Sequence, residues 1–282
     1  MKIRLDLIKF EVSGYVDNAS VHPAVIERFE CFLSELVRNN EILDYNILAI
    51  SNSILLLISS NSESFKGADD IDRIIRNAID NLKKCEYNFA CDVSNLKHFK
   101  NIYFAERKHE SIMIFASVSQ SVLHYNFNIL KMFMEPFSNF DLFKTELSRL
   151  YSINLNFKGH HKSYIQFKDV FKIIKDIRKS KSDFYIESIK DCRDEFMMAS
   201  IEGCTASLWR VSEPFYHLNY ILKGLTYKVL PSTLYDSSNF LDFPKSLAVG
   251  FSIQNGKLFG PIDLFDNSFF DVERNKFYEK FW

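Results

Sequence analysis

The stretch that decides the fold lies near the end of the chain, where residues 248–271 read AVGFSIQNGKLFGPIDLFDNSFFD. Residues 250–253 alternate as in a β-strand, and Asn255-Gly256 is a strong signal for a two-residue hairpin turn. We expect the returning strand to cover residues 257–259 and to end at Gly260-Pro261. This run therefore predicts a β-hairpin.

The residues after the hairpin predict the start of a helix. Asp263 or Asp266 could cap a helix that carries Phe269, Phe270 and Phe277, because a carboxylate at this position accepts hydrogen bonds from free backbone N–H groups. The quoted stretch is thus expected to join a hairpin to a C-terminal helix.

Working outward from this stretch, residue periodicity predicts further strands and helices along the chain. The expected strands cover residues 3–12, 43–50, 54–59, 111–116, 184–189 and 196–201. The expected helices cover residues 23–40, 69–84, 128–134, 170–177 and 215–222, and His22-Pro23 is expected to open the first of them. The polar residues 138–162 are expected to form a loop.

This order of elements favours antiparallel or mixed sheets with helices on one face, an α/β protein of the α+β kind. Two such halves, residues 1–137 and 163–282, would stack their sheets face to face beneath outer helices. We therefore expect a single domain over residues 1–282 with four layers in the order α-β-β-α.

Composition excludes several classes of function. The 282 residues carry 35 basic and 36 acidic side chains, a net charge of -1, so no electrostatic footprint for nucleic acid is present. The basic run at residues 172–181 has apolar positions at helical spacing and favours a solvated helix face.

No apolar run approaches the ~20 residues that span a bilayer, and no leader is recognisable, so we expect a cytoplasmic protein without membrane contact. Five cysteines without a CxxC pair predict no zinc site, and the absence of a glycine-rich phosphate loop predicts no nucleotide cofactor.

Several motifs together resemble one family. The quoted stretch matches the pattern GF-x-x-x-NG-x-L-x-GP-x-DLFD-x-x-x-FD, residues 1–23 match a strand-loop-helix frame without a gap, and Leu43-Asp44-Tyr45 and Glu135-Pro136-Phe137 match shorter blocks. These motifs are similar to those of the archaeal-type (class V) fructose-1,6-bisphosphate aldolase/phosphatases. The resemblance is strong at both ends of the chain, and it implies that family's α-β-β-α sandwich.

The positions at which the family holds magnesium and forms its imine differ in this chain. Glu11 replaces a metal-binding aspartate, and Ser51-Asn52-Ser53 stands where the family has G-D-D. Val118-Ser119 replaces an aspartate-lysine pair, and Val211-Ser212-Glu213-Pro214 stands where the family has K-D-D-P. Because hard cations need clustered carboxylates and an imine needs the lysine, we expect no metal or cofactor and neither bisphosphatase nor Schiff-base aldolase activity.

The resemblance implies a pocket that would hold the remaining polar residues. Glu11, Glu213 and Asp236 would repel one another there, and one of them is expected to retain a proton and to serve in acid–base catalysis. Tyr125 and Asn126 could donate hydrogen bonds to a developing oxyanion. Alternatively, each of these three carboxylates could have no catalytic role and could lie on the surface or form a salt bridge.

Four further residues are candidates for substrate binding, together with Asn126. The resemblance places Asn18 at one of a pair of family histidines and Asn52 at one of the family's magnesium-binding aspartates. Arg107 could bind an anion, or it could pair with a neighbouring glutamate. His124 could carry a proton, or it could be a hydrogen-bonded structural residue.

Two functions remain open. The first is a repurposed, metal-independent enzyme of lyase, isomerase or cyclase type that acts on a non-bisphosphorylated and more hydrophobic small molecule. The second is a non-catalytic pseudoenzyme that binds a metabolite or a protein. We expect the enzyme, and we expect it to form homo-oligomers because the family that it resembles assembles.

Overall fold

The computed structural model describes residues 1–12, 20–62, 76–77, 80, 99–134, 151–165, 168–181, 183–192, 195–211, 219–226, 229–234 and 244–281. The chain divides into two compact units. Unit 1 contains residues 1–110, 236–242 and 252–261, and unit 2 contains residues 111–235, 243–251 and 262–282.

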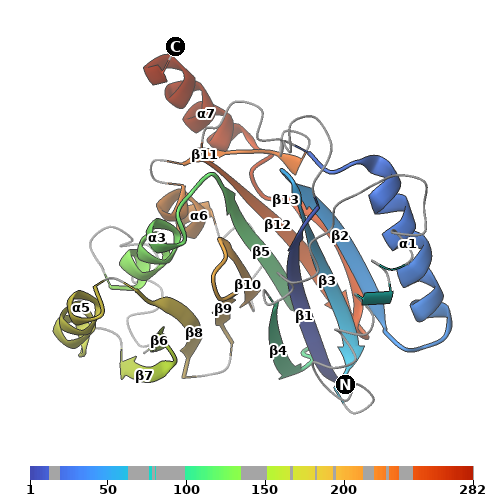
Figure 1. The fold of residues 1–282 in the computed structure, drawn as a ribbon, viewed down its shortest axis with the longest axis horizontal. Coiled ribbons are helices and arrows are strands. Elements are labelled where there is room, and N and C mark those ends of the chain that lie inside the picture. The colour runs from blue at the N-terminus through green and yellow to red at the C-terminus, as the bar shows by residue number, and fades with distance from the viewer. Residues whose placement is uncertain are drawn as a thin grey trace. The chain divides into compact units, whose positions relative to one another are not determined.

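Unit 1 contains a four-stranded sheet with the order β2-β3-β1-β4 in the described residues (Figure 1). Its strands are β1 (Lys2–Glu11), β2 (Asp44–Ile50), β3 (Ser53–Asn61) and β4 (Phe99–Ala105). Every neighbouring pair is antiparallel. Two of these strands, β1 and β3, form the middle of the sheet.

Helix α1 (Pro23–Arg38) covers one face of this sheet. Val25, Phe29, Leu33 and Leu36 recur at the spacing of one helix face and are buried against apolar residues of β1 and β3. His22 Nδ1 accepts a hydrogen bond of 3.1 Å from the Ala24 backbone N–H, so this histidine caps the helix as its position before Pro23 predicts.

Unit 2 is built on a second sheet, whose order is β11-β12-β5-β10-β9-β8-β6-β7, with β13 also paired to β12. Its strands are β5 (Glu110–Val118), β6 (Tyr151–Phe157), β7 (His160–Ile165), β8 (Tyr185–Asp191), β9 (Met197–Ser200), β10 (Ala206–Val211), β11 (Leu230–Pro231), β12 (Lys245–Gln254) and β13 (Lys257–Asp263). Residues 252–261, the tip of the β12–β13 hairpin, belong to unit 1.

Figure 1 shows the helices that accompany this sheet; in the described part of unit 2, four of them contribute side chains to one core cluster with the sheet. They are α3 (Val122–Met134), α5 (Val170–Lys179), α6 (Asn219–Leu225) and α7 (Ser268–Phe281). The predicted α+β fold with mainly antiparallel sheets is confirmed, whereas the four-layer stacking within a single domain stays a prediction.

The expected loop at residues 138–162 is wrong from residue 151 onward, because β6 and the first three residues of β7 lie there. In β6 the apolar residues Tyr151, Ile153, Leu155 and Phe157 alternate with polar residues and enter the core. The polar half of this alternation makes the segment resemble a loop in the sequence.

The hairpin at Asn255-Gly256 is confirmed, but two details differ from expectation. Strand β13 continues through Pro261 to Asp263, as an outer strand can because its outward N–H groups need no partner in the ladder. The residue that caps α7 is Asn267, whose Oδ1 accepts hydrogen bonds from the backbone of Phe269 and Phe270. No helix among the described residues combines the length and the apolar character needed to cross a bilayer.

Candidate functional site

Glu11 and the β2–β3 turn lie together at one end of the unit 1 sheet. Glu11 is paired with Ser53 in the ladder between β1 and β3, and the next backbone N–H, of Val12, donates to the Asn52 carbonyl over 2.7 Å. Ser51 takes a positive φ of 53°, as the first residue of a two-residue hairpin turn often does. We call Glu11, Ser51, Asn52 and Ser53 the Glu11 site.

The side chains of the Glu11 site are one carboxylate, one amide and two hydroxyls. Glu11 is exposed, Asn52 is half-buried, and the Ser53 hydroxyl donates to Asn52 Oδ1 over 3.2 Å. The resemblance places magnesium ligands here, but a magnesium cluster needs several carboxylates. Among the described residues, no group of three histidine, cysteine, aspartate or glutamate side chains is placed to hold a metal ion. The described part of this site therefore does not fit a magnesium cluster.

Arg107 is paired with a buried carboxylate in the segment between β4 and β5. Its Nε donates to Glu110 Oε2 over 3.1 Å, its Nη2 contacts Glu110 Oε1, and its backbone N–H also donates to Glu110 Oε2. Of the two alternatives for Arg107, this arrangement shows the pair with a neighbouring glutamate.

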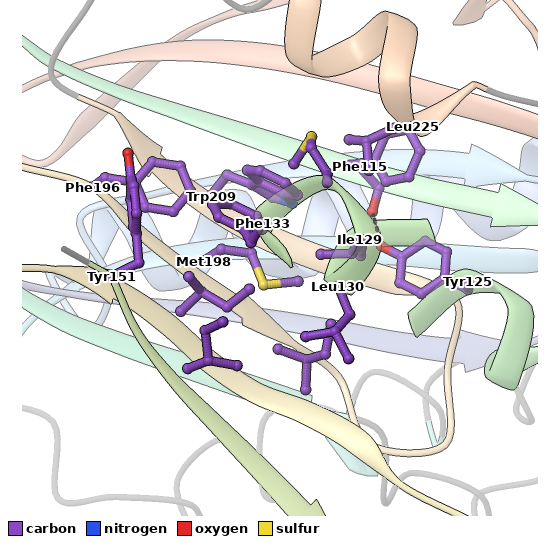
Figure 2. Close-up of a cluster of buried hydrophobic side chains, with 14 of the residues drawn as sticks. Phe115, Tyr125, Ile129, Leu130, Phe133, Tyr151, Phe196, Met198, Trp209 and Leu225 are labelled. Carbon is purple, nitrogen blue, oxygen red and sulfur yellow. Dashed lines mark hydrogen bonds between the residues drawn. The ribbon is translucent and has the colours of Figure 1, made fainter. Parts of the chain in front are cut away.

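Tyr125 is buried in the core of unit 2, where Figure 2 shows it beside Phe115. Its hydroxyl donates to the Phe115 carbonyl over 2.9 Å and lies 2.6 Å from the Ser207 hydroxyl, which accepts a hydrogen bond from Trp209 Nε1. Burial raises the pKa of Tyr125 far above its ordinary value, so the hydroxyl keeps its proton. Through these hydrogen bonds the Tyr125 hydroxyl links α3 to strands β5 and β10.

The neighbours of Tyr125 on α3 also make local hydrogen bonds. Asn126 is buried; its Nδ2 donates to the Val122 carbonyl, and its Oδ1 accepts from the Ile186 backbone N–H on β8. His124 is exposed, and its Nδ1 lies 2.9 Å from the Ser121 hydroxyl just before α3. Asn126 thus joins α3 to the sheet, while His124 is part of the helix cap.

Three of the sequence-predicted site residues lie outside the described residues, namely Asn18, Glu213 and Asp236. Next to this part of the chain, Val211 ends β10 and is buried in the core cluster of unit 2. The resemblance places an imine-forming lysine at this position, and an apolar core is consistent with valine there.

A polar face on strands β6, β7 and β8 holds a pair that the sequence did not predict. His161 Nδ1 lies 2.8 Å from Glu187 Oε2, and the His161 side chain is 63% exposed. The register between β6 and β8 shifts by one residue at Asn154/Leu155, and Glu187 is the extra residue of this bulge. The alternation of polar residues in 151–165 was the signal that could have revealed this face.

Comparisons with known proteins agree with the motifs. A family model described as fructose-1,6-bisphosphatase matches residues 210–281, which include the β12–β13 hairpin and α7. The fructose-1,6-bisphosphate aldolase/phosphatase of Moorella thermoacetica is 25% identical over 97% of this chain and 83% of the relative. The protein of the same name from Metallosphaera sedula is 22% identical over 97% of this chain and 83% of its own length. The chain is therefore a divergent homologue of the fructose-1,6-bisphosphate aldolase/phosphatases.

Proposed function

We propose that this chain is a repurposed enzyme that carries out acid–base chemistry on a small molecule without a magnesium cluster. The observation that carries this proposal is the Glu11 site, where one exposed carboxylate stands beside a turn whose side chains are neutral. A carboxylate in such a place can take a proton from a substrate and return it. The reaction would be of the lyase, isomerase or cyclase type.

Two more carboxylates complete the proposed site. Glu213 and Asp236, which lie outside the described residues, follow from the resemblance alone. If they approach Glu11, mutual repulsion would keep one carboxyl protonated, so that the group could act as the acid while a neighbour acts as the base. Asn52 would hold an oxygen of the substrate by a hydrogen bond.

The substrate is proposed to carry less phosphate than a sugar bisphosphate. Binding two phosphates calls for metal ions or for free cationic side chains. The described ligand positions at Ser51–Ser53 are neutral, and the guanidinium of Arg107 is paired with Glu110. A less charged, more hydrophobic molecule fits these residues better.

A second candidate, a non-catalytic protein that binds a metabolite, is favoured by one specific observation. Tyr125 and Asn126, which the resemblance suggested as oxyanion donors, use their polar atoms to hold α3 on the sheet. A protein that keeps such residues for structure and loses its metal ligands could retain binding alone.

The test is a screen of metabolites by thermal shift with and without Mg²⁺, followed by product analysis of every stabilising compound. We expect a compound that stabilises the chain in the absence of Mg²⁺ and is converted by it. Glu11→Gln should bind this compound but turn it over roughly 10² to 10⁴ times more slowly, the usual contribution of a general acid or base. Glu27→Gln, which changes an exposed glutamate on α1, is the matched control.

Two outcomes would decide against the proposal. Mg²⁺-dependent release of phosphate from fructose 1,6-bisphosphate would show that the ancestral activity persists. Stabilisation by a compound that is never converted, with the same affinity for the wild type and Glu11→Gln, would favour the non-catalytic candidate.

A further inference from the structure

Helix α5 carries apolar side chains on two different faces. Ile173 and Ile177 are buried in the core cluster of unit 2, which explains why the helix packs on the sheet (Figure 1). Phe171, in contrast, is 87% exposed, and Ile174 is 36% exposed. Among the large hydrophobic side chains in the described part of the protein, Phe171 is the most exposed, and exposed apolar surface is unfavourable in water.

The position of Phe171 around the helix axis sets it in the middle of a basic face. Successive residues of a helix are about 100° apart around its axis. Seen down the axis of α5, the side chains on this face therefore follow one another in the order Ile174, Arg178, Phe171, Lys175 and Lys179. These five residues line a shallow hollow of about 420 Å³. We call this surface, made of Phe171, Ile174, Lys175, Arg178 and Lys179, the α5 patch.

The α5 patch is positively charged in a chain that is close to neutral. Residues 168–181 contain six lysine or arginine side chains and two aspartates, whereas the whole chain has a net charge of -1. Asp169 is paired with Lys172 over 2.7 Å, and Asp176 is paired with Lys162 over 2.9 Å. Both aspartates are thus already occupied by other lysines.

The cations of the patch itself have no such partners. Within the described residues, the side chains of Lys175 and Arg178 make neither a hydrogen bond nor an ion pair, and the Lys179 side chain interacts only with the more distant charge of Asp176. Their charges are therefore available to an anionic partner, and they surround an apolar centre.

We propose that the α5 patch is a docking surface for an acidic segment of a partner protein, with an apolar side chain of that segment seated in the hollow beside Phe171. Charge complementarity selects an anionic partner. An apolar anchor in a small hollow with a charged rim is the usual arrangement at protein interfaces. A lipid surface offers no protruding side chain to fill such a hollow, so the hollow favours a protein. This inference is independent of the proposed enzymatic function.

The test is selection of random dodecapeptides, displayed on phage, against the full-length chain, with the variant Phe171→Ser used for counter-selection. We expect the selected peptides to carry aspartate or glutamate residues around a leucine, phenylalanine or similar apolar residue. Synthetic versions should bind the wild type, and their binding should weaken as salt rises, because the Debye length shrinks from about 10 Å at 0.1 M to about 3 Å at 1 M.

Matched variants distinguish a loss of the α5 patch from the effect of changing any exposed apolar or basic residue. Phe171→Ser and Lys175→Glu/Arg178→Glu should each weaken peptide binding by roughly tenfold or more, the loss expected for a central apolar anchor or a charge reversal. Val272→Ser, at a residue that is 51% exposed on α7, and Lys190→Glu, at an exposed residue on β8, should leave binding unchanged. Because the changed residues are exposed, thermal melts should show that all variants fold.

Three results would overturn the inference. The first is a selection without acidic peptides, and the second is equal binding of the selected peptides to Phe171→Ser. The third is sedimentation of the chain with vesicles of phosphatidylserine and phosphatidylcholine that is lost in Phe171→Ser, because this would make the patch a membrane-binding surface.

Discussion

The two ends of strand β2 in unit 1 differ in what the chain has kept. At its start, Leu43-Asp44-Tyr45 matches the family motif; at its end, Ser51-Asn52-Ser53 replaces a glycine and two carboxylates that the resemblance predicts. Both ends belong to one antiparallel sheet and experience the same folding constraints. The comparison therefore separates residues that the scaffold requires from residues that served chemistry.

At the retained end, the two motifs that match the family contact each other. Asp44 Oδ2 accepts a hydrogen bond of 2.7 Å from the Leu258 backbone N–H, and its Oδ1 accepts one of 2.9 Å from Tyr45. A Cβ on Gly256, in the hairpin turn, would lie 2.4 Å from Leu43 Cδ1, so a side chain there would force the Leu43 side chain to shift. The two motifs therefore pack against each other within unit 1.

At the substituted end, backbone atoms make the structural contact. The Val12 N–H donates to the Asn52 carbonyl, a bond that does not depend on the side chain at residue 52. The carboxylates that the resemblance predicts at this turn could thus be lost without loss of the fold. Three of the four predictions below test this distinction, and the other concerns a buried charged pair in the same sheet.

The largest effect is expected from Gly256→Ala at the retained end. Gly256 has a φ of +74°, and a Cβ there would lie 2.4 Å from Leu43 Cδ1, so strain and overlap should together cost about 3 kcal/mol of the free energy of unfolding. The control is Gly159→Ala, at a φ of +87° with nothing within 4 Å of the new Cβ, which should cost only about 1 to 2 kcal/mol. Equal losses in urea titrations would show that the contact with Leu43 is unimportant.

Removal of the Asp44 carboxylate should have the next largest effect. Asp44→Ala leaves two backbone N–H groups without their acceptors, which should cost about 2 kcal/mol. Asp44→Asn keeps one side-chain oxygen and should lose roughly half as much, measured by the same titrations. If both variants are as stable as the wild type, the retained motif does not serve the scaffold.

The third prediction concerns the buried pair Arg4 and Asp6 on β1, where Arg4 Nε lies 2.8 Å from Asp6 Oδ2. Burial raises the pKa of Asp6 to about 6, although hydrogen bonding and charge from Arg4 oppose the shift. The folded chain then binds this proton more tightly than the unfolded chain does. The stabilisation of the folded state by protonation of Asp6 is complete below about pH 4 and is lost as the pH rises through about 6.

The measurement compares the wild type with Arg4→Met/Asp6→Leu, which removes both charges. From about pH 4 to about pH 6, the free energy of unfolding of the wild type should fall relative to the variant by roughly 1 to 2 kcal/mol and then level off. Asp183→Asn, at an exposed aspartate, should leave the wild-type pH profile unchanged. A relative stability that rises with pH would contradict the direction of the Asp6 shift.

The sequence predicted those features that depend on local residue chemistry. Asn255-Gly256 predicted the hairpin because few residues tolerate its backbone angles, and His22-Pro23 predicted the start of α1. The sequence did not reveal β6 and β7, because about half of their side chains are polar, as they are in a loop.

For the candidate site, the sequence indicated which residue types were present but not where they point. The register that pairs Glu11 with Ser53 follows from two neighbouring strands, and it places Glu11 beside the turn. Tyr125 and Asn126 seemed available from their family positions, yet the periodicity of α3 cannot say which of its polar atoms the sheet will use. Such information comes from tertiary packing.

The smallest effect is expected at the substituted end. Ser51 takes a φ of 53°, in a region that disfavours side chains, and the resemblance predicts glycine there. Ser51→Gly should relieve the strain but increase the entropy of the unfolded chain, for a net gain of about 0.5 kcal/mol. Ser53→Gly, in the extended strand β3, has no strain to relieve and should lose about 1 kcal/mol. If Ser51→Gly instead lost as much as Gly256→Ala, the scaffold would require the serine itself, and the two ends of β2 would be equally constrained.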